Sequence, residues 1–218
     1  MINHYINLVC WRAMHDLYDG ARDKVWMDSV SIKLLVGMFR RDAEYRAGTS
    51  ILGRIGPQVN SVPSWFFITA RKLENVALEI QIVLPFLKEG EESDVPDAVR
   101  RAILSLDPGT SVGLGVSSPK QNRIAVALYE LRPDLEYHCL GAALFALEAD
   151  GAEAGRAASL SGSGFEWLRF LVATPRRTWT KIRTTLAEAF RVLLLPSSRQ
   201  KFKLFVAMCE PASHESSR

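Results

Sequence analysis

Cysteine is scarce in this sequence, and its three copies are widely separated. Cys10, Cys139 and Cys209 form no C-x-x-C pair. The sequence therefore predicts neither a disulfide framework nor a thiolate zinc site, and it favours a reducing compartment. The few histidines are never spaced as a helical metal-binding pair, and no carboxylate arrangement resembles a metal site. We expect neither a metal nor a cofactor.

Long apolar runs and phosphate-binding fingerprints are also missing. No apolar run approaches the ~18 residues that a membrane span needs, and the N-terminus lacks the basic start and cleavage site of a signal peptide. We expect a cytoplasmic protein with no membrane partner. Gly113 and Gly115 form half of a dinucleotide fingerprint, but no third glycine follows before a helix, and no Walker loop is present.

The composition is that of an ordinary globular protein. Its 218 residues are 48% hydrophobic and 23% charged, enough for a substantial core and two small lobes. Charge is unevenly spread, because residues 165–218 carry 10 basic and 4 acidic side chains while residues 91–164 carry 6 and 11. This asymmetry indicates an anionic partner, and a solvated basic face is the alternative explanation.

Hydrophobic periodicity predicts a β-α-β-β unit in the middle of the chain. Residues 65–70 and 77–86 have strand-like composition, and a helix follows Asp94 with Val99 and Ile103 on its apolar stripe. Residues 112–116 and 123–131 then read as two strands around a turn. Upstream, a helix is expected from Asp28, with Val30, Leu34, Leu35, Met38 and Phe39 on its apolar side.

The same order of elements recurs in the last third. Residues 139–147 have strand length, and a helix that begins at Pro175 is predicted to bury Trp179, Ile182, Leu186 and Phe190. Strands are expected at 192–195 and 201–208. Residues 117–130 and 197–210, SSPKQNRIAVALYE and SSRQKFKLFVAMCE, align at an offset of 80 residues, which indicates an internal duplication.

These elements predict an α+β fold made of two ferredoxin-like (β-α-β-β) halves with an N-terminal helical segment. The expected domains are residues 1–60 for the helical segment, 61–135 for the first lobe and 136–218 for the second, basic lobe.

Cations cluster on the predicted C-terminal helix and on the segment after it. Guanidinium groups on one rigid element can bind successive phosphates, so this region predicts RNA binding. An ordinary solvated helix face is the alternative. The candidate RNA-binding residues are Arg176, Arg177, Lys181, Arg183, Arg191, Arg199, Lys201 and Lys203.

The segment PSSRQKFKLFVAM, following a basic helix, resembles the C-terminal part of CRISPR repeat-processing endoribonucleases of the type I-F kind, within the RAMP superfamily. In that family a histidine and a serine cleave the RNA backbone without metal, with the 2′-hydroxyl as nucleophile. The resemblance implies metal-independent endoribonuclease activity on a structured, CRISPR-repeat-like RNA in antiviral defence, with Ser197 and Ser198 as catalytic candidates. His15 is the candidate histidine, because the helix expected from Asp28 contains none.

A different class of function stays open. The sheets and apolar helices also suit a non-enzymatic protein-interaction module, such as a chaperone, an immunity protein or an assembly subunit. RNA or other subunits of a ribonucleoprotein complex are the expected partners in the first case, and a protein is the expected partner in the second. His15 then has a structural or merely exposed role, and the two serines are turn residues.

Overall fold

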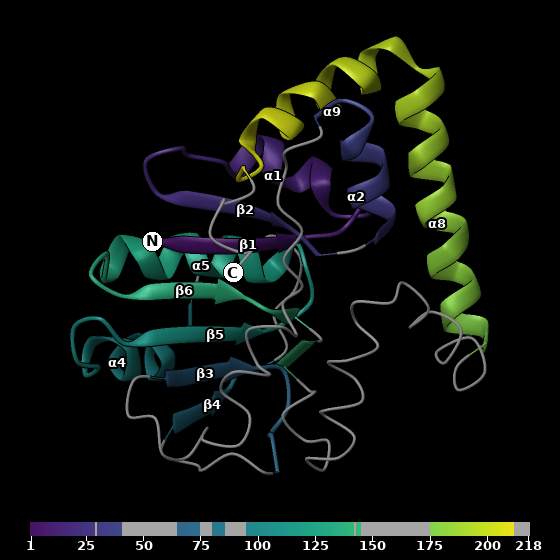
Figure 1. The fold of residues 1–218 in the computed structure, drawn as a ribbon. Helices are drawn as coiled ribbons and strands as arrows, with labels where there is room; N and C mark the ends of the chain where they lie inside the picture. Colours follow the sequence, from purple (N-terminus) through teal and green to yellow (C-terminus); the bar gives the residue numbers. More distant parts are fainter. Residues whose placement is uncertain are drawn as a thin grey trace, which may run out of the picture.

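A single six-stranded parallel sheet forms the centre of the molecule in the computed structural model (Figure 1). The structure describes residues 1–28, 30–40, 65–74, 80–85, 95–141, 143–144 and 175–211. Within them the strand order is β2-β1-β6-β5-β3-β4, and neighbouring strands pair in parallel. The strands are β1 (Ile2–Ile6), β2 (Asp23–Met27), β3 (Trp65–Thr69), β4 (Gln81–Val83), β5 (Ser111–Gly115) and β6 (Glu136–Cys139).

This α/β, Rossmann-like arrangement shows that the predicted pair of ferredoxin-like halves is wrong. Two segments expected to be strands, 123–131 and 201–208, are helical. They belong to α5 (Lys120–Leu131) and α9 (Pro196–Met208). The predicted strand at 192–195 is also wrong, because α8 (Pro175–Leu194) continues through it. The β-α-β-β order therefore does not recur, and each of the three predicted domains contributes strands to the one sheet.

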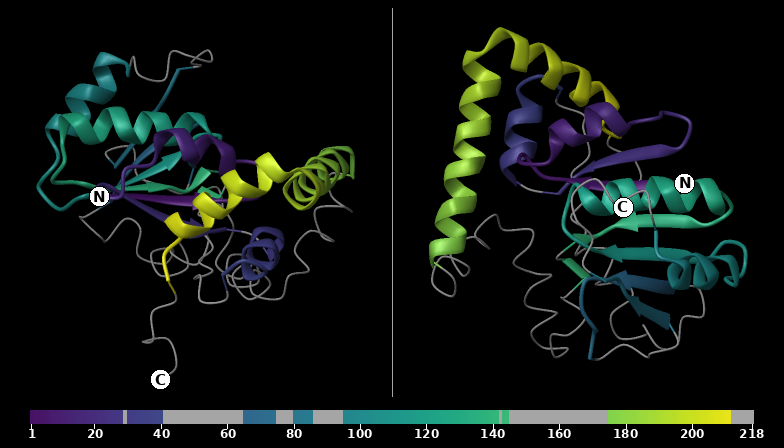
Figure 2. Two further views of the ribbon diagram at one scale, coloured as in Figure 1. Left: turned by 90° about the horizontal axis from the view of Figure 1, so that it is seen from above. Right: turned by 180° about the vertical axis from the view of Figure 1, so that it is seen from behind.

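Helices cover both faces of the sheet. The helices α1 (Trp11–Leu17), α4 (Asp97–Leu104) and α5 lie on one face, whereas α2 (Val30–Gly37) lies on the other (Figure 2). This division follows from the right-handed crossover rule. The connections from β1 to β2, β4 to β5 and β5 to β6 all step across the sheet in the same direction, so their helices share a face. Strands covered on both sides are buried throughout, as β1 and β3 are.

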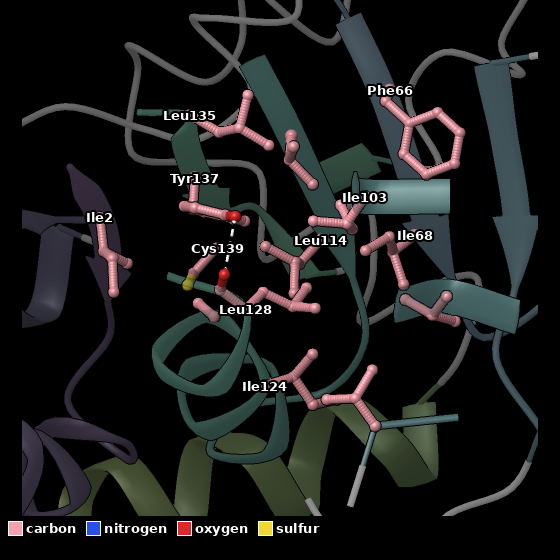
Figure 3. Packing of buried hydrophobic residues seen from close by; sticks show 14 of the residues in the cluster. Ile2, Phe66, Ile68, Ile103, Leu114, Ile124, Leu128, Leu135, Tyr137 and Cys139 are labelled. Carbon is pink, nitrogen blue, oxygen red and sulfur yellow. Dashed lines mark hydrogen bonds between the residues drawn. The ribbon is translucent and has the colours of Figure 1, made fainter. Parts of the chain in front are cut away.

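The larger core lies between the sheet and the helices α4 and α5 (Figure 3). Ile103 from α4 and Ile124 and Leu128 from α5 are fully buried there against Leu114 of β5. The predicted apolar stripe of α4 is confirmed at Val99 and Ile103, which are both buried. Tyr137 of β6 also points into this core, and its hydroxyl donates a hydrogen bond to the carbonyl oxygen of Leu128 at 3.0 Å.

A second core docks the C-terminal helices onto the N-terminal part of the sheet. The ring of Trp11 on α1 packs edge-to-face on Phe202 at a centroid distance of 5.1 Å, and it contacts Phe205 at 5.9 Å. All three side chains are fully buried. The helix α8, which precedes α9, extends along the side of the molecule (Figure 1).

The helix predicted after Asp28 is present as α2, and its expected apolar side is confirmed at Leu35 and Phe39 but wrong at Leu34 and Met38. Ile32, Leu35 and Val36 are buried, whereas Leu34 and Met38 are 69% and 67% exposed. Both sets follow helical spacing, so periodicity alone did not determine which side faces the sheet.

Candidate functional site at the carboxyl edge of the sheet

The three catalytic candidates from the sequence lie on two helices and contact different groups. His15, on α1, is partly exposed, and its Nδ1 lies 3.3 Å from Oδ1 of the exposed Asp16. Ser197 is exposed in the first turn of α9. Ser198 is buried, and its Oγ accepts a hydrogen bond from the Arg12 guanidinium at 3.2 Å. Ser198 therefore helps to hold α9 against α1, and Ser197 is the accessible serine of the two.

The predicted RNA-binding residues lie on α8 and α9. Arg191 donates a hydrogen bond to Glu188 at 2.7 Å, and the Arg199 guanidinium lies 5.7 Å from the centroid of the Phe39 ring. The side chains of Arg177 and Lys181 lie outside the described part of the structure. The remaining candidates are exposed: Arg176, Arg183, Arg191, Arg199, Lys201 and Lys203.

The apolar stripe predicted to be buried on α8 is instead exposed. Trp179, Leu186 and Phe190 are 58%, 52% and 59% exposed. The side of α8 that faces the body carries Glu188 and Val192, which are both buried. Glu188 accepts a hydrogen bond from Arg12 at 3.0 Å, so α8 is attached near its carboxyl end and through a different side from the one predicted.

Topology identifies a second candidate site, between β3 and β5. These neighbouring strands send their connections to opposite faces of the sheet. The described residues after β3 include Leu73, which packs with Phe67 on the α2 face, whereas β5 leads directly into α5 on the other face. In open parallel sheets, ligands bind outside the carboxyl ends of the strands at such a switch point.

Two buried polar atoms at this edge have no hydrogen-bond partner among the described residues. One is the hydroxyl of Thr69, which ends β3 opposite Gly115 of β5. The other is Oε1 of Gln121, in the first turn of α5, whose Nε2 donates to the carbonyl oxygen of Cys139 at 3.1 Å. Thr69 is 0% exposed and Gln121 is 3% exposed. Buried polar atoms are nearly always paired, so these two mark unmet hydrogen-bonding capacity.

The loop between β5 and α5 completes the site. Ser117 is exposed and Lys120, the first residue of α5, is half-buried. Ser118 donates a hydrogen bond to Oδ1 of Asn122 at 2.9 Å, which fixes the orientation of its hydroxyl. The amino end of the 12-residue α5 provides partial positive charge at this edge. The edge therefore combines the partial positive charge of a helix amino end with two buried polar atoms.

Behind this loop, polar contacts continue into the core. Nδ2 of Asn122 donates to Nδ1 of His4 at 2.8 Å. Because Nδ1 accepts, the imidazole proton lies on Nε2, which is 3.3 Å from Oδ1 of Asp23. His4 and Asp23 have fully buried side chains, and Arg22 pairs with the same carboxylate at 2.8 Å. These contacts connect the loop before α5 to the start of β2.

The sequence analysis did not identify Gln121 because it predicted a strand at 123–131, where most of α5 lies, and it placed Thr69 in a strand without predicting which strand lies beside it. The available signal was a helical stripe at Gln121, Ile124, Ala125 and Leu128, all of which are buried. The rejected glycine pair serves packing. A Cβ on Gly113 would lie 2.8 Å from the Phe67 ring, and one on Gly115 would lie 2.7 Å from Leu144.

No helix in the described part of the chain is long and apolar enough to cross a bilayer. Among the same residues, no three histidine, cysteine, aspartate or glutamate side chains gather as metal ligands. Comparison with family models, curated proteins and solved structures found no match.

Proposed function

We propose that this protein binds a small phosphorylated molecule of the nucleotide class at the carboxyl edge of its sheet, between β3 and β5. The observations that carry this proposal are two buried polar atoms that have no partner among the described residues: Thr69 Oγ1 at the end of β3, beside the switch point, and Gln121 Oε1 in the first turn of α5, next to the end of β6. The fold alone does not define the ligand, so the class is inferred from the chemistry of these groups.

The groups at this edge favour a ligand with two chemical parts. The amino end of α5 attracts an anion, for which phosphate is the usual ligand. Oε1 of Gln121 can only accept a hydrogen bond, so it requires a hydroxyl or amino donor on the ligand. The Thr69 hydroxyl can donate or accept. Phosphate together with sugar hydroxyls and base amino groups supplies these partners.

Ligand binding predicts a specific loss of affinity in Thr69→Val. This substitution keeps the shape of the side chain and removes the hydroxyl, so we expect the dissociation constant for the best-bound nucleotide to rise about tenfold. Isothermal titration calorimetry with ATP, ADP, AMP and inorganic phosphate would identify that nucleotide and measure the change. The same nucleotide should also raise the melting temperature of the unsubstituted protein above its value without ligand.

Thr110→Val is the matched control. Thr110 is also buried, but it precedes β5 at the amino edge of the sheet, where its hydroxyl donates to the carbonyl oxygen of Asp107. This variant should lose some stability and keep its affinity. Equal affinity of Thr69→Val and the unsubstituted protein, or failure of every phosphorylated compound to bind, would contradict the proposal.

RNA binding by α8 and α9 stays a prediction, which the exposure of six of its candidate cations supports. We expect Arg176→Ala with Arg177→Ala to weaken binding of a CRISPR-repeat-like RNA hairpin. Fluorescence anisotropy at several salt concentrations gives the slope of log K against log[salt]. This slope should become shallower by about 0.7 to 0.9 for each phosphate contact that is lost. Arg101→Ala, an exposed arginine on α4, is the control. Binding that does not respond to salt would favour a protein partner instead.

Cleavage of that RNA also stays a prediction. A metal-independent reaction through the 2′-hydroxyl would leave a 2′,3′-cyclic phosphate and would continue in EDTA. Ser197→Ala is the variant of interest, because Ser197 is exposed whereas Ser198 is buried. Cleavage that stops when EDTA is added would rule out this mechanism.

A further inference from the structure

The helix α8 carries a continuous apolar stripe on an exposed side. Its residues recur at alternating intervals of three and four, the spacing of a heptad seam. Trp179, Leu186 and Leu193 occupy one seam position and are 58%, 52% and 40% exposed. Ile182 and Ala189 occupy the other position and are partly exposed, and Phe190 lies beside the seam with 59% exposure.

This stripe lies next to the contact that holds α8 to the body, and Ala189 at its edge also packs against the second core. That contact uses Glu188 and Val192, four residues apart on another side of the helix, together with Arg12 of α1. Figures 1 and 2 show α8 standing along the side of the molecule, connected to the sheet through α9. Most of its length is therefore accessible to a partner.

Exposed apolar surface is concentrated here. Of the thirteen exposed large hydrophobic residues in the described part of the structure, five lie on α8: Trp179, Leu186, Phe190, Leu193 and Leu194. Scattered exposed leucines are normal on a protein surface, but an apolar stripe on one helix marks an interaction site. A seam of this spacing is complementary to a second helix that lies along α8.

Charge determines which kind of helix fits. Arg176 and Arg183 are exposed and seven residues apart, so both flank the same side of the seam. In total α8 has five basic residues and one acidic residue, Glu188, which already pairs with Arg12 and Arg191. A second copy of α8 would place two strongly basic helices side by side. Carboxylates on a partner helix would instead pair with the flanking arginines.

We propose that α8 is a docking surface for an acidic amphipathic helix of another protein. The partner helix buries its apolar side against Trp179, Leu186 and Leu193, and its carboxylates face Arg176 and Arg183. This interaction is independent of the ligand site proposed at the sheet edge, because the two surfaces use no residue in common.

The test uses a labelled synthetic peptide of three heptads, with leucine at both seam positions and glutamate at the flanking positions. The glutamates keep the free peptide from pairing with itself, since like charges repel across such a seam. Fluorescence anisotropy should show saturable binding to the full chain, and a peptide with lysine at the flanking positions should bind at least about tenfold more weakly.

Leu186→Asp should weaken binding of the glutamate peptide by at least about tenfold, because it places a charge at the centre of the seam. Leu104→Asp is the matched control, since Leu104 is 55% exposed on α4. This variant should bind the glutamate peptide with unchanged affinity. Circular dichroism of both variants shows whether the fold is kept. Arg183→Glu provides a second variant that leaves the apolar stripe intact and should also weaken binding.

Three results would overturn the proposal. Equal binding of the glutamate and lysine peptides would remove the role of charge. A dimer in sedimentation equilibrium that Leu186→Asp dissociates would identify a second copy as the occupant. Binding to phosphatidylserine vesicles or to RNA that Leu186→Asp abolishes, with no binding of the glutamate peptide, would assign the stripe to a lipid surface or a nucleic acid.

Discussion

Asp23→Ala is expected to lower the free energy of unfolding by about 3–5 kcal/mol, because it removes one partner from a buried network of charges. The carboxylate accepts hydrogen bonds from the Arg22 guanidinium at 2.8 Å and from the backbone amide of Asp19 at 2.9 Å. It also lies 3.3 Å from Nε2 of His4. Without it, the fully buried imidazole and the partly exposed guanidinium both lose their counterpart.

Urea denaturation at pH 7 measures this loss. Asp16→Ala is the control, since the Asp16 side chain is 86% exposed and lies beside His15, which is itself partly exposed. A substitution of this kind usually changes stability by less than about 0.5 kcal/mol. Similar losses in the two variants would contradict the role given to the buried carboxylate.

The same carboxylate predicts how stability responds to acid. Burial alone would raise the pKa of Asp23, but the contacts with His4, Arg22 and the Asp19 amide lower it from 3.8 to about 2. The group is therefore more acidic in the folded state than in the unfolded state. Its contribution, on the order of 2 kcal/mol, is complete above the unfolded pKa and is lost as the pH falls from about 4 to about 2. Asp23→Asn should lack this part of the acid dependence.

Phe202→Ala is expected to destabilise the protein by about 3–5 kcal/mol, as truncation of a fully buried phenylalanine leaves a cavity. Its ring packs edge-to-face on Trp11 and, at a centroid distance of 5.7 Å, on Phe39. These contacts connect α9 to α1 and to the residues that follow α2. Loosening them should also expose the junction between α8 and α9 to protease.

Thermal denaturation and limited proteolysis measure the two effects. Leu204→Ala is the matched control, because Leu204 lies on the same helix and is 52% exposed. It should leave both the melting temperature and the cleavage pattern nearly unchanged. If Phe202→Ala behaved in the same way, α9 would have to be held by other contacts.

The sequence predicted local structure better than topology. The helix at 97–104 and the strands at 65–69 and 111–115 lie where their patterns indicated. The errors at 123–131 and 201–208 have a physical cause. Phe202, Leu204 and Val206 alternate like a strand, but Phe202, Phe205, Val206 and Cys209 follow a helical spacing, and only the second set is buried in full.

The candidate site was harder to predict because it depends on long-range topology. Thr69 and Gln121 lie in different halves of the predicted first lobe, and they share an edge only because β3 and β5 are parallel neighbours. The exposure of the apolar side of α8 was equally hard to predict. Its stripe has the composition of a buried helix face, and the sequence does not show that the body contacts Glu188 and Val192 instead.

The position of β6 also has a consequence for the order in which the molecule can assemble. This strand lies between β1 and β5, so Ile2 pairs with Tyr137, which pairs in turn with Val112. Among the described strands, a chain synthesised only as far as β5 lacks the one that joins β1 and β2 to β3, β4 and β5. A chain that ends before β6 would expose two open sheet edges, and such edges promote aggregation. The centre of the sheet is therefore the last part of it to be synthesised.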